Sequence, residues 1–259
     1  MEYTIAIPSY MRESILKENT LKYINDVGIN PDNIDIFVAN KSEEERYKDC
    51  IPKDMYNEII VGKLGIGKQR TFMRKYYDVG EKIIMLDDDL TTFKYLNRDN
   101  KLSDLKDFDK LIKLSYKTMK KYKTGLMGIY QMDNAFYMTH SINKGLYFII
   151  GYCNFTINSH DLPTLSEVSE DYELSIKSYL KYGSVLKWNN ITATNYSRKT
   201  NKVKSVVSTE KNFRTKEKLL KRYPKYIRQN KKRKYNTFEI DFIKQPNNER
   251  IYLRSDMFE

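Results

Sequence analysis

Short apolar segments alternate with amphipathic segments along the first third of the chain. The predicted strands there cover residues 3–7, 34–39, 58–62 and 82–86. The predicted helices between them cover residues 12–26, 43–49 and 68–77. This order of strands and helices predicts an α/β fold, with a Rossmann-like, mostly parallel central sheet flanked by helices on both faces.

The pattern changes in the rest of the chain. The strands expected there cover residues 125–130, 135–140, 146–155 and 185–195, and the helices cover 108–122 and 170–182. Turn residues between neighbouring strands favour hairpins, so we expect the sheet to become mixed. We expect a catalytic domain at residues 1–197, followed by a basic, aromatic-interleaved, mainly helical segment at 198–259.

Composition narrows the class of protein. The 259 residues can bury a full core, and 40% of them are hydrophobic. The net charge of +12 favours a polyanionic partner, although a lysine-rich composition alone would produce the same charge. The two cysteines, Cys50 and Cys153, have no Cys-x-x-Cys spacing, so neither a disulfide framework nor a zinc site is expected. With no visible signal peptide and no apolar run long enough for a bilayer, we expect a cytoplasmic protein without a membrane.

The basic character concentrates after residue 198, where tyrosines alternate with lysines and arginines. Cations that follow phosphates, beside aromatic rings that stack on bases, are typical of a nucleic-acid surface. The residues expected to bind DNA are Arg222, Lys225, Arg228, Lys231, Lys232 and Arg233. A solvated helix in a lysine-rich protein explains the same segment equally well.

Three consecutive carboxylates, Asp87, Asp88 and Asp89, directly follow the apolar strand at 82–86. Aspartate is depleted inside strands, so these side chains are expected at the carboxyl end of the sheet, where α/β proteins bind ligands. Crowded carboxylates repel each other unless a hard divalent cation, shared with phosphate oxygens, lies between them. A solvated acidic loop is the alternative interpretation.

Two further motifs each allow two interpretations. Residues 62–69, Gly-Lys-Leu-Gly-Ile-Gly-Lys-Gln, nearly match the phosphate loop of P-loop NTPases, but Gln69 replaces the Ser or Thr that binds magnesium. We therefore interpret these glycines as a tight strand-to-helix turn. Glu170 and Asp171 begin a predicted helix, where the helix dipole favours acids, and a carboxylate there is also placed to act as a general base. The two histidines, His140 and His160, form no metal or triad pattern.

The order of these motifs resembles that of GT-A-fold glycosyltransferases. The motifs are Ile7-Pro8-Ser9-Tyr10-x-Arg12, Phe37-Val38-Ala39-Asn40, Gly65-Ile66-Gly67-Lys68-Gln69-Arg70, Leu86-Asp87-Asp88-Asp89 and Glu170-Asp171-Tyr172. More narrowly, the chain resembles the DNA-modifying glycosyltransferases of phages and of the base J pathway. The resemblance covers about residues 3–193 and implies a GT-A sheet with a basic C-terminal extension.

The resemblance also implies roles for individual residues. Those expected at the donor nucleotide are Pro8, Ser9, Arg12, Asn40, Gly65, Arg70 and Asp88. Asp87 and Asp89 would hold Mn²⁺ or Mg²⁺, with Asp171 as the general base and Glu170 as its substitute. Those expected at the acceptor are Gly151, Tyr152 and Asn154. Many such enzymes add a late histidine as a third metal ligand, and this chain has none after His160.

We therefore expect a metal-dependent, inverting enzyme that transfers a sugar, glucose from UDP-glucose, onto a hydroxymethylated pyrimidine in double-stranded DNA. One alternative is a glycosyltransferase that acts on a saccharide or protein. The other is a DNA-binding protein or metal nuclease that is not a glycosyltransferase.

Overall fold

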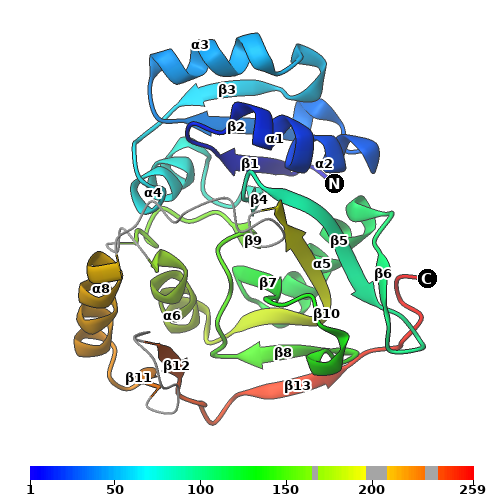
Figure 1. Cartoon of the computed structure of the whole chain (residues 1–259). Coiled ribbons are helices and arrows are strands. Elements are labelled where there is room, and N and C mark those ends of the chain that lie inside the picture. Colours follow the sequence, from blue (N-terminus) through cyan, green and yellow to red (C-terminus); the bar gives the residue numbers. More distant parts are fainter. Residues whose placement is uncertain (165–168, 197–208, 231–238) are drawn as a thin grey trace.

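The computed structural model describes residues 1–164, 169–196, 209–230 and 239–259 (Figure 1). The strands are β1 (Thr4–Pro8), β2 (Ile34–Val38), β3 (Glu58–Val61), β4 (Lys82–Leu86), β5 (Leu90–Leu96), β6 (Leu102–Asp104), β7 (Leu126–Tyr130), β8 (Ser141–Gly145), β9 (Cys153–Ile157), β10 (Val185–Asn195), β11 (Ile227–Gln229), β12 (Ile240–Phe242) and β13 (Glu249–Tyr252). The helices are α1 (Glu13–Leu16), α2 (Lys22–Asp26), α3 (Lys41–Cys50), α4 (Ile66–Tyr76), α5 (Phe108–Tyr122), α6 (Glu170–Tyr182) and α8 (Thr209–Arg222). A π-helical turn, Lys17–Leu21, joins α1 to α2.

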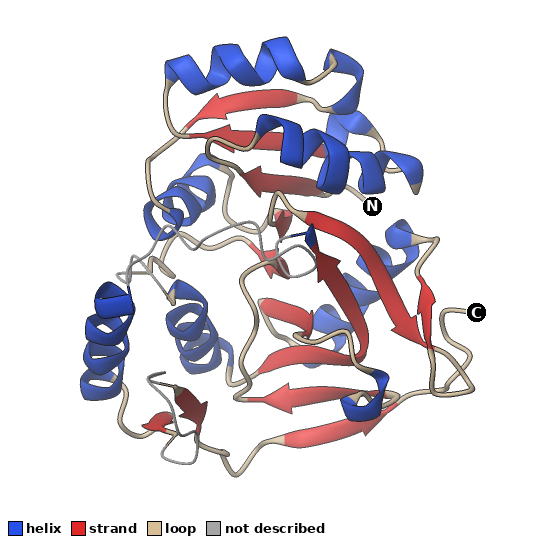
Figure 2. Cartoon of the chain, in the orientation of Figure 1, coloured by secondary structure: helices blue, strands red, loops and turns tan. Residues whose placement is uncertain are grey.

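One sheet runs through most of the described chain, in the order β13-β8-β10-β7-β9-β4-β1-β2-β3, with β5 and β6 attached through β10. The four strands β3, β2, β1 and β4 are parallel to one another. Beyond β4 most pairings are antiparallel, and β7 with β10 is a parallel pair. The prediction of a mixed α/β sheet flanked by helices is confirmed (Figure 2).

The apolar run before the aspartates is explained by packing on both faces of β4. Ile84 lies in the main core cluster, which also contains Tyr23 of α2 and Leu111 of α5. Ile83 belongs to a second cluster on the opposite face, under α4. Because successive side chains of a strand point to opposite faces, a strand covered on both sides must be apolar throughout.

Two strand predictions in the middle of the chain are wrong. Residues 135–140 were expected as a strand, but Ala135–Tyr137 is a 3-10 turn, and β8 begins only at Ser141. The side chain of Asn134 accepts a hydrogen bond from the Phe136 N–H, which favours a turn over extended backbone.

Residues 146–155 were also expected as a strand, but β9 begins at Cys153 and residues 146–152 form a loop. The apolar residues of this loop are buried outside the sheet. Leu146 packs with Ile176 of α6, and the N–H of Ile149 donates to Ser175 of the same helix. Strands β5 and β6, by contrast, were not predicted.

The C-terminal part contains the expected helix, α8, together with strands that were not expected. In Figure 1, α8 lies beside α6, with the hairpin β11–β12 below them. Leu219 of α8 and Ile240 of β12 pack with Ile176 of α6 in one apolar cluster. The chain then returns to the main sheet, where β13 pairs with β8. The boundary proposed at residue 198 stays a prediction. None of the described helices combines the length and apolarity that crossing a membrane requires.

Candidate active site

The three consecutive aspartates form a tight turn between β4 and β5, and their side chains diverge. The turn is fixed by backbone contacts from two sides. Asp87 N–H donates to the Tyr152 carbonyl (2.9 Å), and Thr20 Oγ1 donates to the Asp87 carbonyl (2.8 Å) while accepting from Leu90 N–H (2.8 Å). Thr20 lies in the π-helical turn, a feature that is frequent at functional sites. The turn therefore presents each carboxylate in a different, fixed direction.

The middle aspartate, Asp88, points toward the end of β1. Ser9 Oγ donates to it at 2.7 Å, and the Arg12 guanidinium lies 3.2 Å away. Burial raises the pKa of Asp88 to about 6, although Arg12 and Ser9 favour its ionised form. Asp88 thus fixes the orientations of Ser9 and Arg12, two residues expected at the donor nucleotide.

Arg70, on α4, connects the aspartate turn to α6. Its Nη2 donates to Asp87 Oδ1 (2.6 Å) and to the Gly151 carbonyl (2.8 Å), while Nη1 pairs with Glu170. Burial alone would lower the pKa of Arg70, but the carboxylates of Glu170 and Asp87 raise it above its ordinary value. A Cβ at Gly151 would collide with the Arg70 guanidinium, so glycine is required for this close approach. Residues far apart in sequence therefore meet around one buried cation.

The two acids at the start of α6 are in different environments. Glu170 is buried and paired with Arg70, whereas Asp171, within the described part of the chain, accepts hydrogen bonds from the backbone N–H groups of Tyr172 (3.0 Å) and Gly151 (3.4 Å). Burial, followed by the charge of Glu170, raises the pKa of Asp171 to about 7. A buried carboxylic acid with a raised pKa is typical of acid–base sites. Asp171 is the acid suited to exchange a proton near neutral pH.

The third aspartate, Asp89, contacts the end of β10. Asn195 Nδ2 donates to Asp89 Oδ1 (3.1 Å), and Tyr196 N–H donates to the Asp89 carbonyl (2.7 Å). The other atom of the Asn195 amide, Oδ1, is buried and has no hydrogen-bond partner among the described residues. Burial leaves such an oxygen without compensation for its lost hydration, so a missing partner is indicated.

This arrangement fits a divalent cation. No group of three His, Cys, Asp or Glu side chains within the described ranges could hold a metal by itself. However, carboxylate and amide oxygens are both ligands that Mg²⁺ and Mn²⁺ accept, and these ions commonly keep substrate phosphates as further ligands. Asp87, Asp89 and Asn195 Oδ1 could therefore hold the ion together with phosphate oxygens of a ligand.

Other residues expected at the site have structural contacts of their own. The Asn40 side chain accepts from Glu43 N–H and caps α3, and Gly65, with φ of 96°, precedes α4 as the predicted turn. Pro8 ends β1. Asn154 is 1% exposed and donates to the Gly151 carbonyl, so it supports the loop from inside the sheet. Tyr152 is also buried, and its hydroxyl donates to the Tyr130 carbonyl.

The residues expected to bind DNA divide into two groups. Arg222, Lys225 and Arg228 are exposed, at the end of α8 and in β11. Arg222 pairs with Glu173 of α6 at 3.1 Å, while Lys225 and Arg228 form no ion pair with a described residue. Lys231, Lys232 and Arg233 lie outside the described residues.

Thr20, Gln69 and Asn195 have contacts at the site that the sequence pattern does not indicate. Gln69 accepts from Lys63 N–H and donates to the Val38 carbonyl, which joins the ends of β2 and β3. Asn195 lies at the end of a predicted strand, 106 residues after Asp89. Its contact with Asp89 could be predicted only if the pairing of the strands were known. Thr20 has no local signal.

Comparisons with known proteins agree with this architecture. No protein-family model and no curated protein sequence matches the chain. The solved structures similar to it include S. aureus TarS 1–349 in complex with UDP (14% identity, TM-score 0.51), a match that covers 83% of this chain and 63% of that one. Glucosyl-3-phosphoglycerate synthase from Mycobacterium tuberculosis, with Mn²⁺, UDP and glucosyl-3-phosphoglycerate, is also similar (9% identity, TM-score 0.51), covering 99% of this chain and 91% of that one. The chain spans less than two thirds of the TarS fragment, and at these identities the likeness shows the fold alone. The fold is that of GT-A nucleotide-diphospho-sugar transferases.

Proposed function

We propose that the protein is a metal-dependent glycosyltransferase that uses a nucleotide-sugar donor, a UDP-sugar by preference. The observation that carries this proposal is the position of Arg70, which brings Asp87 and the acid pair of α6 into one site at the carboxyl end of β4. Similar solved structures hold UDP, or UDP with Mn²⁺, which supports a nucleotide diphosphate and a divalent metal as ligands here.

The residues of the site would have separate roles in binding the donor and in the reaction. Ser9 and Arg12, held by Asp88, line the nucleotide side of the site. Asp87 and Asp89 would hold a divalent cation, which when bound would supply positive charge to stabilise the leaving diphosphate. Asp171 accepts the proton of the acceptor hydroxyl as its oxygen attacks the anomeric carbon. The bond from that carbon to the diphosphate breaks, and the sugar is transferred with inversion.

The acceptor that we propose is a hydroxymethylated pyrimidine in double-stranded DNA. The exposed cations Lys225 and Arg228 and the net charge of +12 support a polyanionic acceptor. A saccharide acceptor is the competing function, because the fold also occurs in an enzyme solved with glucosyl-3-phosphoglycerate, in which the sugar is attached to a small molecule and not to DNA.

One experiment separates these functions. The protein is incubated with Mn²⁺, UDP-glucose and duplex DNA that contains 5-hydroxymethylcytosine or 5-hydroxymethyluracil, and the nucleosides are analysed by mass spectrometry after digestion. We expect a hexose on the modified base and stoichiometric release of UDP, with neither on unmodified DNA. UDP release that depends on an added saccharide instead of DNA would overturn the acceptor. DNA cleavage without UDP release would support the nuclease and refute the glycosyltransferase.

A further inference from the structure

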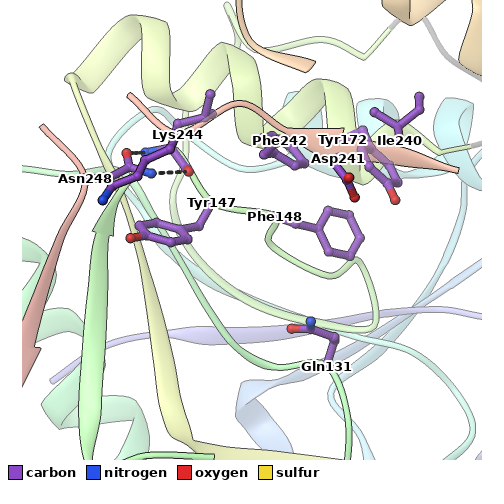
Figure 3. A pocket seen from close by; sticks show the side chains of 10 residues that line it. Gln131, Tyr147, Phe148, Tyr172, Ile240, Asp241, Phe242, Lys244 and Asn248 are labelled. Carbon is purple, nitrogen blue, oxygen red and sulfur yellow. Dashed lines mark hydrogen bonds between the residues drawn. The ribbon is translucent and has the colours of Figure 1, made fainter. Parts of the chain in front are cut away.

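An aromatic pocket lies beside the candidate active site and has no role in the chemistry described above. Its volume is about 390 Å³. It is lined by Gln131, Leu146, Tyr147, Phe148, Tyr172, Ile240, Asp241, Phe242, Lys244 and Asn248 (Figure 3). Ligand sites for small molecules begin at about 300 Å³, so the pocket suits a group the size of a nucleoside and excludes a DNA duplex.

The rings on one side of the pocket are arranged as a stack. Tyr172 and Phe242 lie nearly parallel, with ring centroids 5.6 Å apart and an interplanar angle of 11°. Phe148 lies against Tyr172 at 4.5 Å, tilted by 34°. Figure 3 shows Tyr147 and Phe148 on one side and Tyr172 with Phe242 on another. Flat aromatic surfaces of this kind stack on planar bases.

Polar groups complete the lining of the pocket. Asp241 carries a carboxylate, which accepts hydrogen bonds from N–H groups, and Gln131 carries an amide that both donates and accepts. Asn248 has a structural role, because its amide donates to the Leu146 carbonyl (3.0 Å) and accepts from Leu146 N–H (2.7 Å). The pocket therefore combines stacking faces with a few hydrogen-bonding groups, as a site for a planar polar ring requires.

The pocket is joined to the candidate active site by the chain itself. Tyr172 directly follows Asp171, the proposed general base, at the start of α6. Phe148 lies on the same loop as Gly151, whose N–H contacts Asp171 and whose carbonyl contacts Arg70. A ring stacked on the outer face of Phe148 or Tyr172 would therefore lie near the group proposed to remove the acceptor proton.

The same hairpin carries both the pocket and a surface cation. Asp241 and Phe242 belong to β12, and Asp241 is paired directly with Arg228 of β11. Arg228 is exposed and has no ion pair among the described residues. A nucleic-acid backbone on this surface would bring its bases close to the pocket opening.

We propose that this pocket receives the target pyrimidine after it has left the base stack, with Phe148, Tyr172 and Phe242 as stacking surfaces and Asp241 and Gln131 at its polar edge. The inference rests on the proposed function, since it identifies the binding site of the acceptor. Enzymes that do chemistry on a base of a duplex commonly extrude it into a pocket. The C5 substituent of a pyrimidine faces the major groove, but a pocket too small for a duplex can receive the base only after it has left the stack.

The test measures base extrusion separately from donor binding. A duplex carries one 5-hydroxymethyluracil, with 2-aminopurine as the opposite base, whose fluorescence rises when its partner leaves the stack. The probe is titrated with the full chain in the presence of Mn²⁺ and UDP. The variants are Phe242→Ala, Phe148→Leu and Asp241→Asn, and Phe136→Ala serves as the control because that ring is exposed outside the pocket.

We expect the fluorescence to rise with the wild type and the control. Phe148→Leu and Phe242→Ala should each weaken the response by about 5- to 100-fold, as loss of one stacking partner does, while binding of UDP with Mn²⁺ is unchanged. Phe148→Leu keeps an apolar side chain and is therefore expected to preserve the fold. If Phe242→Ala lowers the melting temperature, the fluorescence response of Phe148→Leu tests the inference.

Two results would overturn the inference alone. The first is UDP binding without any rise in fluorescence. The second is an unchanged fluorescence response in Phe148→Leu, together with binding of a monosaccharide in the pocket in place of the nucleotide. Failure of the wild type to bind UDP with Mn²⁺ would instead overturn the proposed function.

Discussion

Arg70 and Glu170, one hundred residues apart in sequence, form a buried ion pair that joins α4 to the first turn of α6. The same guanidinium donates to Asp87 and to the Gly151 carbonyl. The guanidinium reaches these acceptors from two different nitrogens, Nη1 and Nη2, whereas an ammonium would have to donate to all of them from a single nitrogen. The pair therefore sets the position of the two acids at the start of α6 relative to the aspartate turn.

The first prediction concerns this geometry. Arg70→Lys keeps the charge but loses the two donor nitrogens of the guanidinium. We expect kcat/KM for sugar transfer to fall by about 100-fold or more, because small displacements of reacting groups have effects of this size. Gly151→Ala, which pushes against the guanidinium, should reduce kcat/KM in the same direction while leaving Arg70 itself intact. Steady-state kinetics with thermal melts measure both effects. Wild-type kinetics in both variants would contradict the role of Arg70.

The second prediction concerns the metal. If Asn195 Oδ1 is a ligand, Asn195→Leu should weaken Mn²⁺ binding, measured by electron paramagnetic resonance of free Mn²⁺, by about 10-fold or more. Asn195→Asp should melt at a lower temperature without metal, because it places a second carboxylate beside Asp89. Added Mn²⁺ should restore that melting temperature.

The matched control for this series is Asp256→Asn, which removes one acid at a surface ion pair remote from the site. Mn²⁺ affinity equal to wild type is expected in the control. Equal affinity in Asp89→Asn as well would show that the ion is bound elsewhere.

The third prediction concerns pH. With the pKa of Asp171 raised to about 7, the base is protonated in acid, so kcat/KM should rise with pH and level off above about 7. Asp171→Asn should abolish this rise of kcat/KM with pH and lower the rate by about 10²- to 10⁴-fold. Glu170→Gln removes a negative charge that raises the pKa of Asp171, so in this variant the rise of kcat/KM should occur at lower pH. A profile that is identical in all three proteins would assign the base to another group.

The fourth prediction concerns stability. Lys187, on β10, is 7% exposed and forms no ion pair with a described residue, although Tyr130 and Tyr147 face its ammonium. Burial, with Arg250 nearby, lowers the pKa of Lys187 from 10.5 to about 8. Between these values the unfolded chain binds more protons than the folded one, so stability should increase as the pH rises from about 8 to 10.5.

Lys187→Met should remove that increase and should raise the free energy of unfolding at pH 7 by about 1 to 3 kcal/mol, as relief of an unpaired buried charge does. Urea denaturation at pH 7 and at pH 10 measures both effects. A surface replacement, Lys218→Met on α8, provides the comparison, since it should leave the pH dependence unchanged. A less stable Lys187→Met protein at pH 7 would indicate that the two rings stabilise the charged form.

Much of the first half of the molecule was evident from local pattern. The strand before the aspartates is apolar because both of its faces are covered, and its end had to be a turn because three carboxylates cannot be buried in a sheet. The order of motifs likewise predicted the GT-A fold, and helix α5 was predicted with the bounds it has.

Only the tertiary structure determined how the site is assembled. The sequence does not show which side chain each of the three aspartates contacts. In the structure Asp87 contacts Arg70 of α4, Asp88 contacts Arg12 after β1, and Asp89 contacts Asn195 of β10. The apolar run at residues 146–152 predicts a strand. It is a loop in the structure, because residues such as Ile149 pack on α6 and not in the sheet. Periodicity reports which residues are buried, but the element that buries them, and the side chain that neutralises a given charge, depend on contacts between segments that are far apart in the chain.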